Sequence, residues 1–246
     1  MTIREEIKKM KAASWEISAS THEKRCEALK KIKETLQNNK AEIYEANASD
    51  LKRAEEEKIS DSVKKRLKFD DGKMSDVCAG IDRLVSLEDP IGKVELEREL
   101  DSDLILKRIS VPIGVIGVIF EARPDALVQI ATLCIKSGNC AILKGGKETS
   151  NTNKILFNII YEAAIAHGAP SSCMHLAEGH SEVDELLACD KYVDLIIPRG
   201  SNAFVQYIMN NTRIPVMGHA DGVCHTYIEK NADKDKAVKI ILDAKT

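Results

Sequence analysis

The stretch VPIGVIGVIFEARP, residues 111–124, decides the fold of this chain. From Ile113 to Phe120 it has no charged residue and many β-branched ones, a pattern typical of a strand buried on both faces. Glu121 and Arg123 follow at the end of the strand, and Pro124 suits the first turn of a helix. The stretch therefore predicts a strand, a polar turn and a helix start. In open parallel sheets, ligands bind at such strand ends.

After this stretch, short apolar runs alternate with helical patterns. A helix that follows Pro124 is expected to end at Gly138, and Cys140–Leu143 reads as the next buried strand. Further strands are expected near residues 174–177, 193–197, 214–217 and 223–228. The alternation predicts βαβ units, and therefore an α/β fold with a Rossmann-like, mostly parallel sheet.

The chain before residue 111 has a different character. Residues 2 to about 100 have mainly helical patterns, and Ser20 is the expected N-cap of one helix because Glu23 completes a capping box. In residues 94–112, two alternating segments flank Asp101-Ser102-Asp103, which predicts a β-hairpin. A lone hairpin is poorly stable, so we expect it to pack against a neighbouring subunit.

Composition excludes several classes of function. The 246 residues are 43% hydrophobic and 30% charged, as in an ordinary globular protein, and the net charge of −3 gives no bulk attraction to nucleic acid or to an anionic membrane. The start MTIREEIKKMKAAS lacks the apolar core of a signal peptide, and no run is as long as a membrane span. We therefore expect a cytosolic protein. Seven cysteines without a CxxC pair indicate reduced, mostly buried thiols.

Three turns after predicted strands carry small or cationic residues. They contain Arg123, the run KGGK at residues 144–147, and the run PRGS at residues 198–201. Phosphates and riboses of dinucleotides are bound by such glycines, hydroxyls and cations, although glycine turns are often only structural and Arg199 could equally pair with an acid. Neither GxGxxG nor the P-loop pattern is present. A residue between Thr149 and Thr152 is expected to cap the next helix.

A metal site is the weaker alternative. The pattern Cys173-x-His175-x4-His180 fits no common zinc spacing, so we expect no metal ligands in this chain.

Four runs together resemble one family. VPIGVIGVIFEARPDAL, SGNCAILKGGKETSNTN, IIPRGSNAFVQYI and IPVMGHADGVCHTYIEK are closely similar to the γ-glutamyl phosphate reductases (glutamate-5-semialdehyde dehydrogenases), a branch of the aldehyde dehydrogenase superfamily. The resemblance implies an aldehyde-dehydrogenase-like fold and the reduction of L-glutamyl 5-phosphate by NADPH to L-glutamate 5-semialdehyde and phosphate, in proline biosynthesis. The partners would be a small-molecule substrate and a second copy of the chain.

The resemblance also implies roles for single residues. Lys144 matches the superfamily lysine that contacts the adenosine ribose, whereas Lys147 stands where NAD-preferring relatives have a ribose-binding glutamate. This departure favours the 2′-phosphate of NADP. Ala122 stands at the oxyanion-binding asparagine, which leaves Arg123 as a possible substitute. The residues expected to bind cofactor are Lys144, Gly145, Gly146, Lys147, Pro198, Arg199, Gly200 and Ser201, and those expected to bind substrate are Glu121 and Arg123.

The family's mechanism also requires a cysteine nucleophile. In the family this residue follows the stretch that matches residues 243–246, so it is expected beyond Thr246, and none of the seven cysteines matches it. Cys224 stands beside His225, but neighbours on a strand point to opposite faces, which argues against a catalytic pair. The expected organisation is a helical part of the cofactor-binding domain (1–93), an oligomerisation hairpin (94–112) and a dinucleotide-binding part (113–246), with the catalytic domain absent.

Two other functions stay open. The first is an NADP-binding and oligomerisation module without catalytic activity of its own. The second is an amino-acid kinase, because some reductases are fused to one. The absence of a kinase-like glycine-rich segment before residue 100 argues against the kinase.

Overall fold

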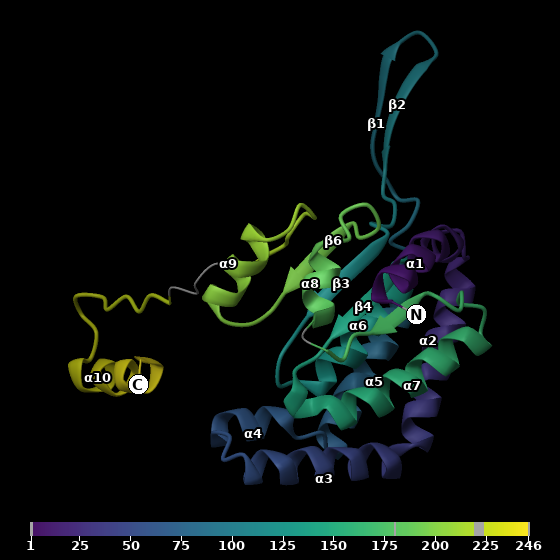
Figure 1. Ribbon diagram of the computed structural model, residues 1–246. Coiled ribbons are helices and arrows are strands. Elements are labelled where there is room, and N and C mark those ends of the chain that lie inside the picture. The colour runs from purple at the N-terminus through teal and green to yellow at the C-terminus, as the bar shows by residue number, and fades with distance from the viewer. Residues whose placement is uncertain (1, 180, 219–223, 246) are drawn as a thin grey trace.

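The computed structural model describes residues 2–179, 181–218 and 224–245 (Figure 1). Its helices are α1 (Ile3–Ser18), α2 (His22–Asn38), α3 (Lys40–Glu56), α4 (Asp61–Leu67), α5 (Asp71–Ser86), α6 (Pro124–Lys136), α7 (Ser150–Ala166), α8 (Ser181–Leu187), α9 (Asn202–Asn210) and α10 (Lys234–Lys245), with a 3-10 turn η1 (Lys147–Thr149). The strands are β1 (Val94–Asp101), β2 (Leu104–Ile109), β3 (Val115–Ile119), β4 (Cys140–Lys144), β5 (Met174–Leu176) and β6 (Leu195–Pro198).

The main sheet has the strand order β5-β4-β3-β6, and all its neighbours are parallel, as the sequence predicted. Every residue of β3 and β4 is buried. The β3 strand begins at Val115 rather than at Ile113, because Gly114 has a φ of +123°. A Cβ on Gly114 would collide with the Asp194 carboxylate, which accepts a hydrogen bond from the Val115 amide at 2.8 Å.

Helices cover both faces of this sheet. Leu186 of α8 packs over Gly117 on one face, and α1 contacts α8 and the central strands there. The helix α6 packs against β4, and α2, α5 and α7 pack around α6. One continuous hydrophobic cluster joins side chains of α1, α2 and α5 to those of the sheet. The N-terminal helices therefore share a core with the α/β part.

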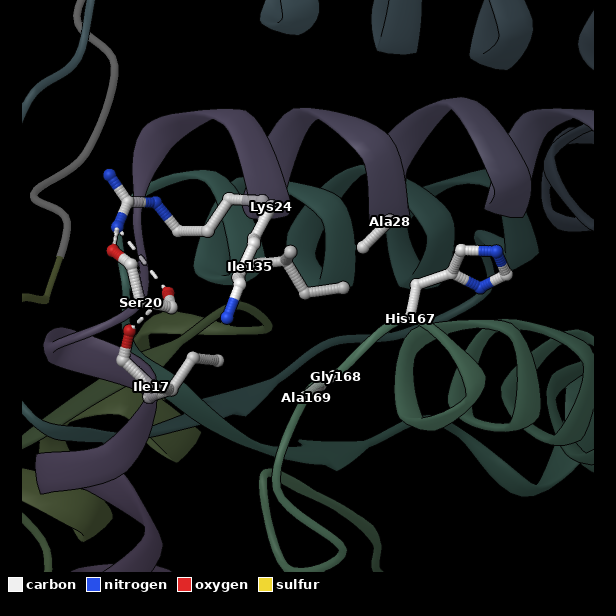
Figure 2. Close-up of a pocket in the computed structure, with 9 residues that line it drawn as sticks. Ile17, Ser20, Lys24, Ala28, Ile135, His167, Gly168 and Ala169 are labelled. Atoms are coloured by element: carbon white, nitrogen blue, oxygen red, sulfur yellow. Dashed lines mark hydrogen bonds between the residues drawn. The ribbon is translucent and has the colours of Figure 1, made fainter.

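The predicted cap of α2 was wrong by one residue. Thr21, not Ser20, is the N-cap and accepts a hydrogen bond from the Lys24 amide at 3.4 Å. The Ser20 hydroxyl instead donates to the carbonyl oxygen of Ile17 at 2.6 Å, beside a small pocket that Lys24 and His167 also line (Figure 2). This pocket lies near the carboxyl ends of helices α6 and α7. It is therefore on the side of the sheet where the strands begin, away from the carboxyl ends of the strands.

The hairpin predicted in residues 94–112 is present. Strands β1 and β2 pair antiparallel, and the connecting residue Asp103 has a φ of +61°. The hairpin projects away from the rest of the molecule (Figure 1). Apolar side chains on it, such as Leu104 and Ile105, are exposed. Its role in an oligomer stays a prediction.

The region after β6 differs from expectation. The strand predicted at 214–217 is reduced to one parallel bridge between Ile196 and Val216. Residues 224–228 form no regular strand, and Val223 lies outside the described residues. The helix α10 has no buried side chain and lies apart from the sheet (Figure 1). No helix in the described residues is both long enough and apolar enough to cross a membrane.

Candidate functional site

The three polar turns predicted from the sequence meet at one edge of the sheet. The Phe120 amide, just after β3, donates to the carbonyl oxygen of Lys144 at the end of β4, at 2.9 Å. The Arg199 amide, just after β6, donates to the carbonyl oxygen of Ile119 at 2.7 Å. Because β3 is the neighbour of both β4 and β6, the turn after β3 lies between the other two.

Side chains fill the space beside three glycines in these turns. A Cβ on Gly145 would lie closer than 3.0 Å to the Asn153 amide nitrogen, and a Cβ on Gly146 closer than 3.0 Å to the Glu148 carboxylate. At Gly200 the corresponding position is 3.2 Å from a carboxylate oxygen of Glu121. The turns after β3 and β6 are therefore in contact, and the turn after β4 has no room for larger residues at two positions.

Lys144 is buried at the end of β4, with 6% of its surface exposed. Its ammonium group donates to the carbonyl oxygen of Gly145 at 2.7 Å. Burial lowers the pKa of Lys144, while the charges of Glu148 and Glu182 oppose this shift. A buried cation thus stands directly beneath the glycine turn.

A cleft of about 220 Å³ lies between the turn after β4, the start of α7 and the turn after β5. Gly145, Gly146 and Lys147 line it on one side, and Ala177 on the other. The Lys147 side chain is 78% exposed, and its nitrogen lies 4.0 Å from the nearest carboxylate oxygen, that of Glu57. Lys147 can therefore reach a ligand in the cleft.

Asn153 also lines this cleft and is 2% exposed. Its amide nitrogen donates to the Thr149 hydroxyl at 2.9 Å, but its buried carbonyl oxygen has no hydrogen-bond partner among the described residues. An unpaired buried acceptor is unfavourable. A ligand with a hydroxyl or amino donor would satisfy it, and sequence reasoning missed this residue because an Asn inside a helix carries no recognisable signal.

The start of α7 is capped from another helix. The carboxylate of Asp50, on α3, accepts from the Thr152 amide at 2.8 Å and from the Thr152 hydroxyl at 2.7 Å, and Thr149 makes no side-chain cap. Arg53 donates to the Asp50 carboxylate and to the carbonyl oxygen of Lys147, both at 2.7 Å. The N-cap residue of α7 therefore lies within the predicted range, at Thr149, but its side chain makes no capping hydrogen bond, and the Asp50 carboxylate occupies the anion-binding end of this helix.

The turn after β3 has an unusual backbone. Ala122 is buried and has a φ of +50°, a left-handed conformation that is uncommon for a residue other than glycine. Next to it, the guanidinium of Arg123 donates to the Asp125 carboxylate at 3.0 Å, which raises the pKa of Arg123. Asp125 is 2% exposed, and Lys73 contacts it at 3.2 Å. Arg123 is thus held through its guanidinium group by Asp125, and its side chain is half exposed.

The four residues of the PRGS turn, 198–201, lie in different surroundings. Pro198 is the buried last residue of β6, and Ser201 is the N-cap of α9, where its hydroxyl accepts from the Phe204 amide at 3.3 Å. Arg199 lines an apolar groove that includes Ile113 and residues of α6, rather than the cleft at Lys147. Gly200 is the member of this turn that contacts the turn after β3.

The cysteines are free, and six of the seven are buried, as predicted. Burial raises the pKa of Cys134 and Cys173 to about 12 in both cases. Cys224 is exposed, but it does not lie on a strand, so the strand argument against a pair with His225 has no support here. The described residues contain no cluster that could hold a metal ion; His180 is outside them.

Comparison with known proteins places this geometry in a family. The aldehyde dehydrogenase family profile matches residues 1–246. A γ-glutamyl phosphate reductase of Acetivibrio thermocellus is 54% identical over 246 residues, which are 100% of this chain and 57% of that protein. The chain thus spans little more than half the length of this curated relative.

Two solved structures have the same architecture. A γ-glutamyl phosphate reductase from Thermotoga maritima superposes with a TM-score of 0.89 at 34% identity, over 98% of this chain and 59% of that one. The corresponding protein from Saccharomyces cerevisiae gives a TM-score of 0.83 at 42% identity, over 100% of this chain and 63% of that one. With its α/β fold and with the family profile matched along its whole length, the chain belongs to the aldehyde dehydrogenase family.

Proposed function

We propose that this chain is the cofactor-binding part of a γ-glutamyl phosphate reductase, which uses NADPH to reduce L-glutamyl 5-phosphate to L-glutamate 5-semialdehyde and phosphate in the cytosol. The names of the relatives support the reaction. The observation that carries the proposal is the meeting of three polar turns at the carboxyl edge of a parallel sheet, which is where α/β proteins bind dinucleotides. We assign residues 1–93 and 113–246 to this part and residues 94–112 to oligomer contacts.

The cleft beside Lys147 has the chemistry that an adenosine phosphate requires. Lys147, at its rim, would pair with the 2′-phosphate of NADP. The unpaired carbonyl oxygen of Asn153 would accept from a ribose hydroxyl or from the adenine amino group. Gly145 and Gly146 let the Asn153 and Glu148 side chains pack against the turn that lines the cleft, and the bound cofactor would supply the hydride.

The turn after β3 is suited to the substrate. Arg123 presents a cation that Asp125 holds in place, and a guanidinium is a good partner for a phosphate or for the carbonyl oxygen of an acyl group. Glu121 lies against Gly200, so its carboxylate borders both the turn after β3 and that after β6. We assign to both residues contacts with glutamyl phosphate.

None of the seven cysteines of these 246 residues matches the nucleophilic cysteine of the family. The chain should therefore bind NADPH without completing turnover, and the alternative of a binding and oligomerisation module differs only in whether a catalytic part follows. Turnover by these 246 residues of glutamate semialdehyde with phosphate and NADP⁺ would show that the argument about the missing cysteine is wrong.

Cofactor selectivity tests the assignment of Lys147. Replacement of Lys147 by Glu places a negative charge beside the 2′-phosphate, so the affinity for NADPH should fall by roughly tenfold or more, whereas NADH, which lacks this phosphate, should be much less affected. Fluorescence titration of both cofactors gives the two dissociation constants. Glu57→Gln serves as the control, because it removes the acidic neighbour of Lys147 and keeps the cation. Equal losses for NADPH and NADH would remove the assignment.

A further inference from the structure

The carboxylate of Glu148 lies between two of the turns that form the candidate site. Its Oε1 accepts a hydrogen bond from the Ala122 amide at 2.6 Å. This bond connects the turn after β4, which carries Glu148, to the turn after β3, which carries Ala122. The same carboxylate occupies the space where Gly146 would carry a Cβ. Its negative charge also acts on the buried ammonium group of Lys144. Glu148 thus touches both turns.

The amide that Glu148 binds belongs to the residue with the least favourable backbone in the site. Ala122 has a φ of +50° and is buried, so its conformation persists only if its surroundings hold it. The buried amide of Ala122 would also lack a partner without this carboxylate. The hydrogen bond from the Ala122 amide to Glu148 therefore stabilises the left-handed conformation of Ala122.

The position of Ala122 makes this turn important. Glu121 and Arg123, on either side of it, diverge: Glu121 lies against Gly200, and Arg123 reaches Asp125. A relaxation of Ala122 to ordinary backbone angles would rotate both side chains away from these contacts. The orientation of the two proposed substrate residues therefore depends on the Ala122 conformation.

We propose that Glu148 is a positioning residue, which holds Ala122 in the left-handed conformation and so fixes Glu121 and Arg123 relative to the nucleotide cleft. This inference deepens the proposed function and rests on it for the identity of the ligand. The competing role is a direct contact between Glu148 and a ribose hydroxyl of the cofactor. In that role the negative charge of Glu148 and its contact with the cofactor would determine NADPH affinity, and the conformation of Ala122 would not affect it.

A double-mutant cycle separates these roles. The variants of the whole chain are Glu148→Ala, Glu148→Gln, Ala122→Gly and the double variant Glu148→Ala with Ala122→Gly. Glycine adopts a positive φ without strain, so it should make the turn independent of Glu148. Glu162→Ala is the matched control, because Glu162 is an exposed carboxylate on the adjoining helix α7.

Two readouts are measured for every variant. The first is hydrogen exchange in the peptide that contains residues 120–125, which needs no ligand. Glu148→Ala should speed exchange at Ala122 by at least tenfold, and Glu148→Gln, which keeps an acceptor oxygen, by less than threefold. The second is the NADPH dissociation constant, which should rise about fivefold in Glu148→Ala and return to within twofold of the parent in the double variant. Glu162→Ala should change neither readout.

The outcomes distinguish this inference from the proposed function. If the parent chain binds no NADPH, the proposed function fails, and hydrogen exchange still decides whether Glu148 holds the turn. Unchanged exchange in Glu148→Ala would overturn the positioning role. A loss of NADPH affinity that Ala122→Gly does not restore, or an equal loss in Glu148→Gln, would overturn it in favour of a direct ligand contact. If Glu148→Ala does not fold, its recovery in the double variant, seen by thermal unfolding, supports the role, and continued failure contradicts it.

Discussion

Asp50 links the N-terminal helices to the candidate site, and its removal should be costly. The carboxylate is fully buried and accepts hydrogen bonds from the Asn151 and Thr152 amides and from the Thr152 hydroxyl. Asp50→Ala would leave these donors and Arg53 without this partner. A lost helix cap costs up to about 2 kcal/mol, and breaking a buried charged network costs about 3–5 kcal/mol.

We expect Asp50→Ala to lower the free energy of unfolding by an amount near the lower end of this range, because a third of the Arg53 side chain is exposed and can be rehydrated. A loss of about 3 kcal/mol corresponds to a fall in Tm of roughly 6–12 °C for a chain of this size. Urea unfolding followed by circular dichroism measures the free energy of unfolding. NADPH affinity should also fall, because Arg53 holds the carbonyl oxygen of Lys147.

A second aspartate provides the control for this experiment. Asp82 also pairs with a cation, Lys33, but is 59% exposed, so Asp82→Ala should cost less than about 1 kcal/mol. Asp50→Asn keeps an acceptor oxygen and should lie between the two. If Asp50→Ala is no more destabilising than Asp82→Ala, the account of how α3 supports the cleft is wrong.

Three further predictions concern acid stability, thiol reactivity and self-association. Burial raises the pKa of Asp125, but hydrogen bonds and charges from Arg123 and Lys73 outweigh burial and leave this pKa below its ordinary value. The ionised carboxylate therefore stabilises the fold fully above the unfolded-state pKa, and this stabilisation is lost as the pH falls through the folded-state pKa. Asp125→Asn should flatten the pH dependence of the unfolding free energy below about pH 4, and an unchanged slope would contradict the pairing. Cys224, the exposed cysteine, should react first with a thiol reagent in native protein, as peptide mass spectrometry can show, and equal labelling of a buried cysteine would contradict its burial. The double variant Leu104→Lys with Leu106→Lys should weaken any self-association that sedimentation detects, because both leucines are exposed on the hairpin. Trp15→Lys, which replaces an exposed apolar residue outside the hairpin, should not weaken it. Equal effects of the two variants would argue against the hairpin as the contact.

The parts of the fold that could be predicted are those set by local pattern. The run from Val115 to Ile119 is apolar on both faces, and Gly138 is in the left-handed conformation that ends a helix. The hairpin turn at Ser102–Asp103 likewise follows from the sequence around it. Parallel pairing then follows from the βαβ rule, whereas the strand order, with β6 beside β3, does not follow from local pattern.

The parts that could not be predicted depend on distant residues. Asp50 caps a helix that starts 100 positions later, and an aspartate inside a helical pattern gives no sign of this. The role of Glu148 depends on the φ of Ala122, which no local motif indicates. The turn at residues 198–201 predicts that Arg199 binds cofactor, but Arg199, directly after β6, lines the apolar groove together with Ile197.

The central claim is that three turns form one binding site for a phosphorylated nicotinamide dinucleotide. Hydrogen exchange with and without saturating NADPH tests it most directly. We expect NADPH to protect residues 120–123, 144–154 and 199–201 simultaneously, with no change in the hairpin at 94–112. Protection of a single turn, or of a surface away from the carboxyl edge of the sheet, would contradict it.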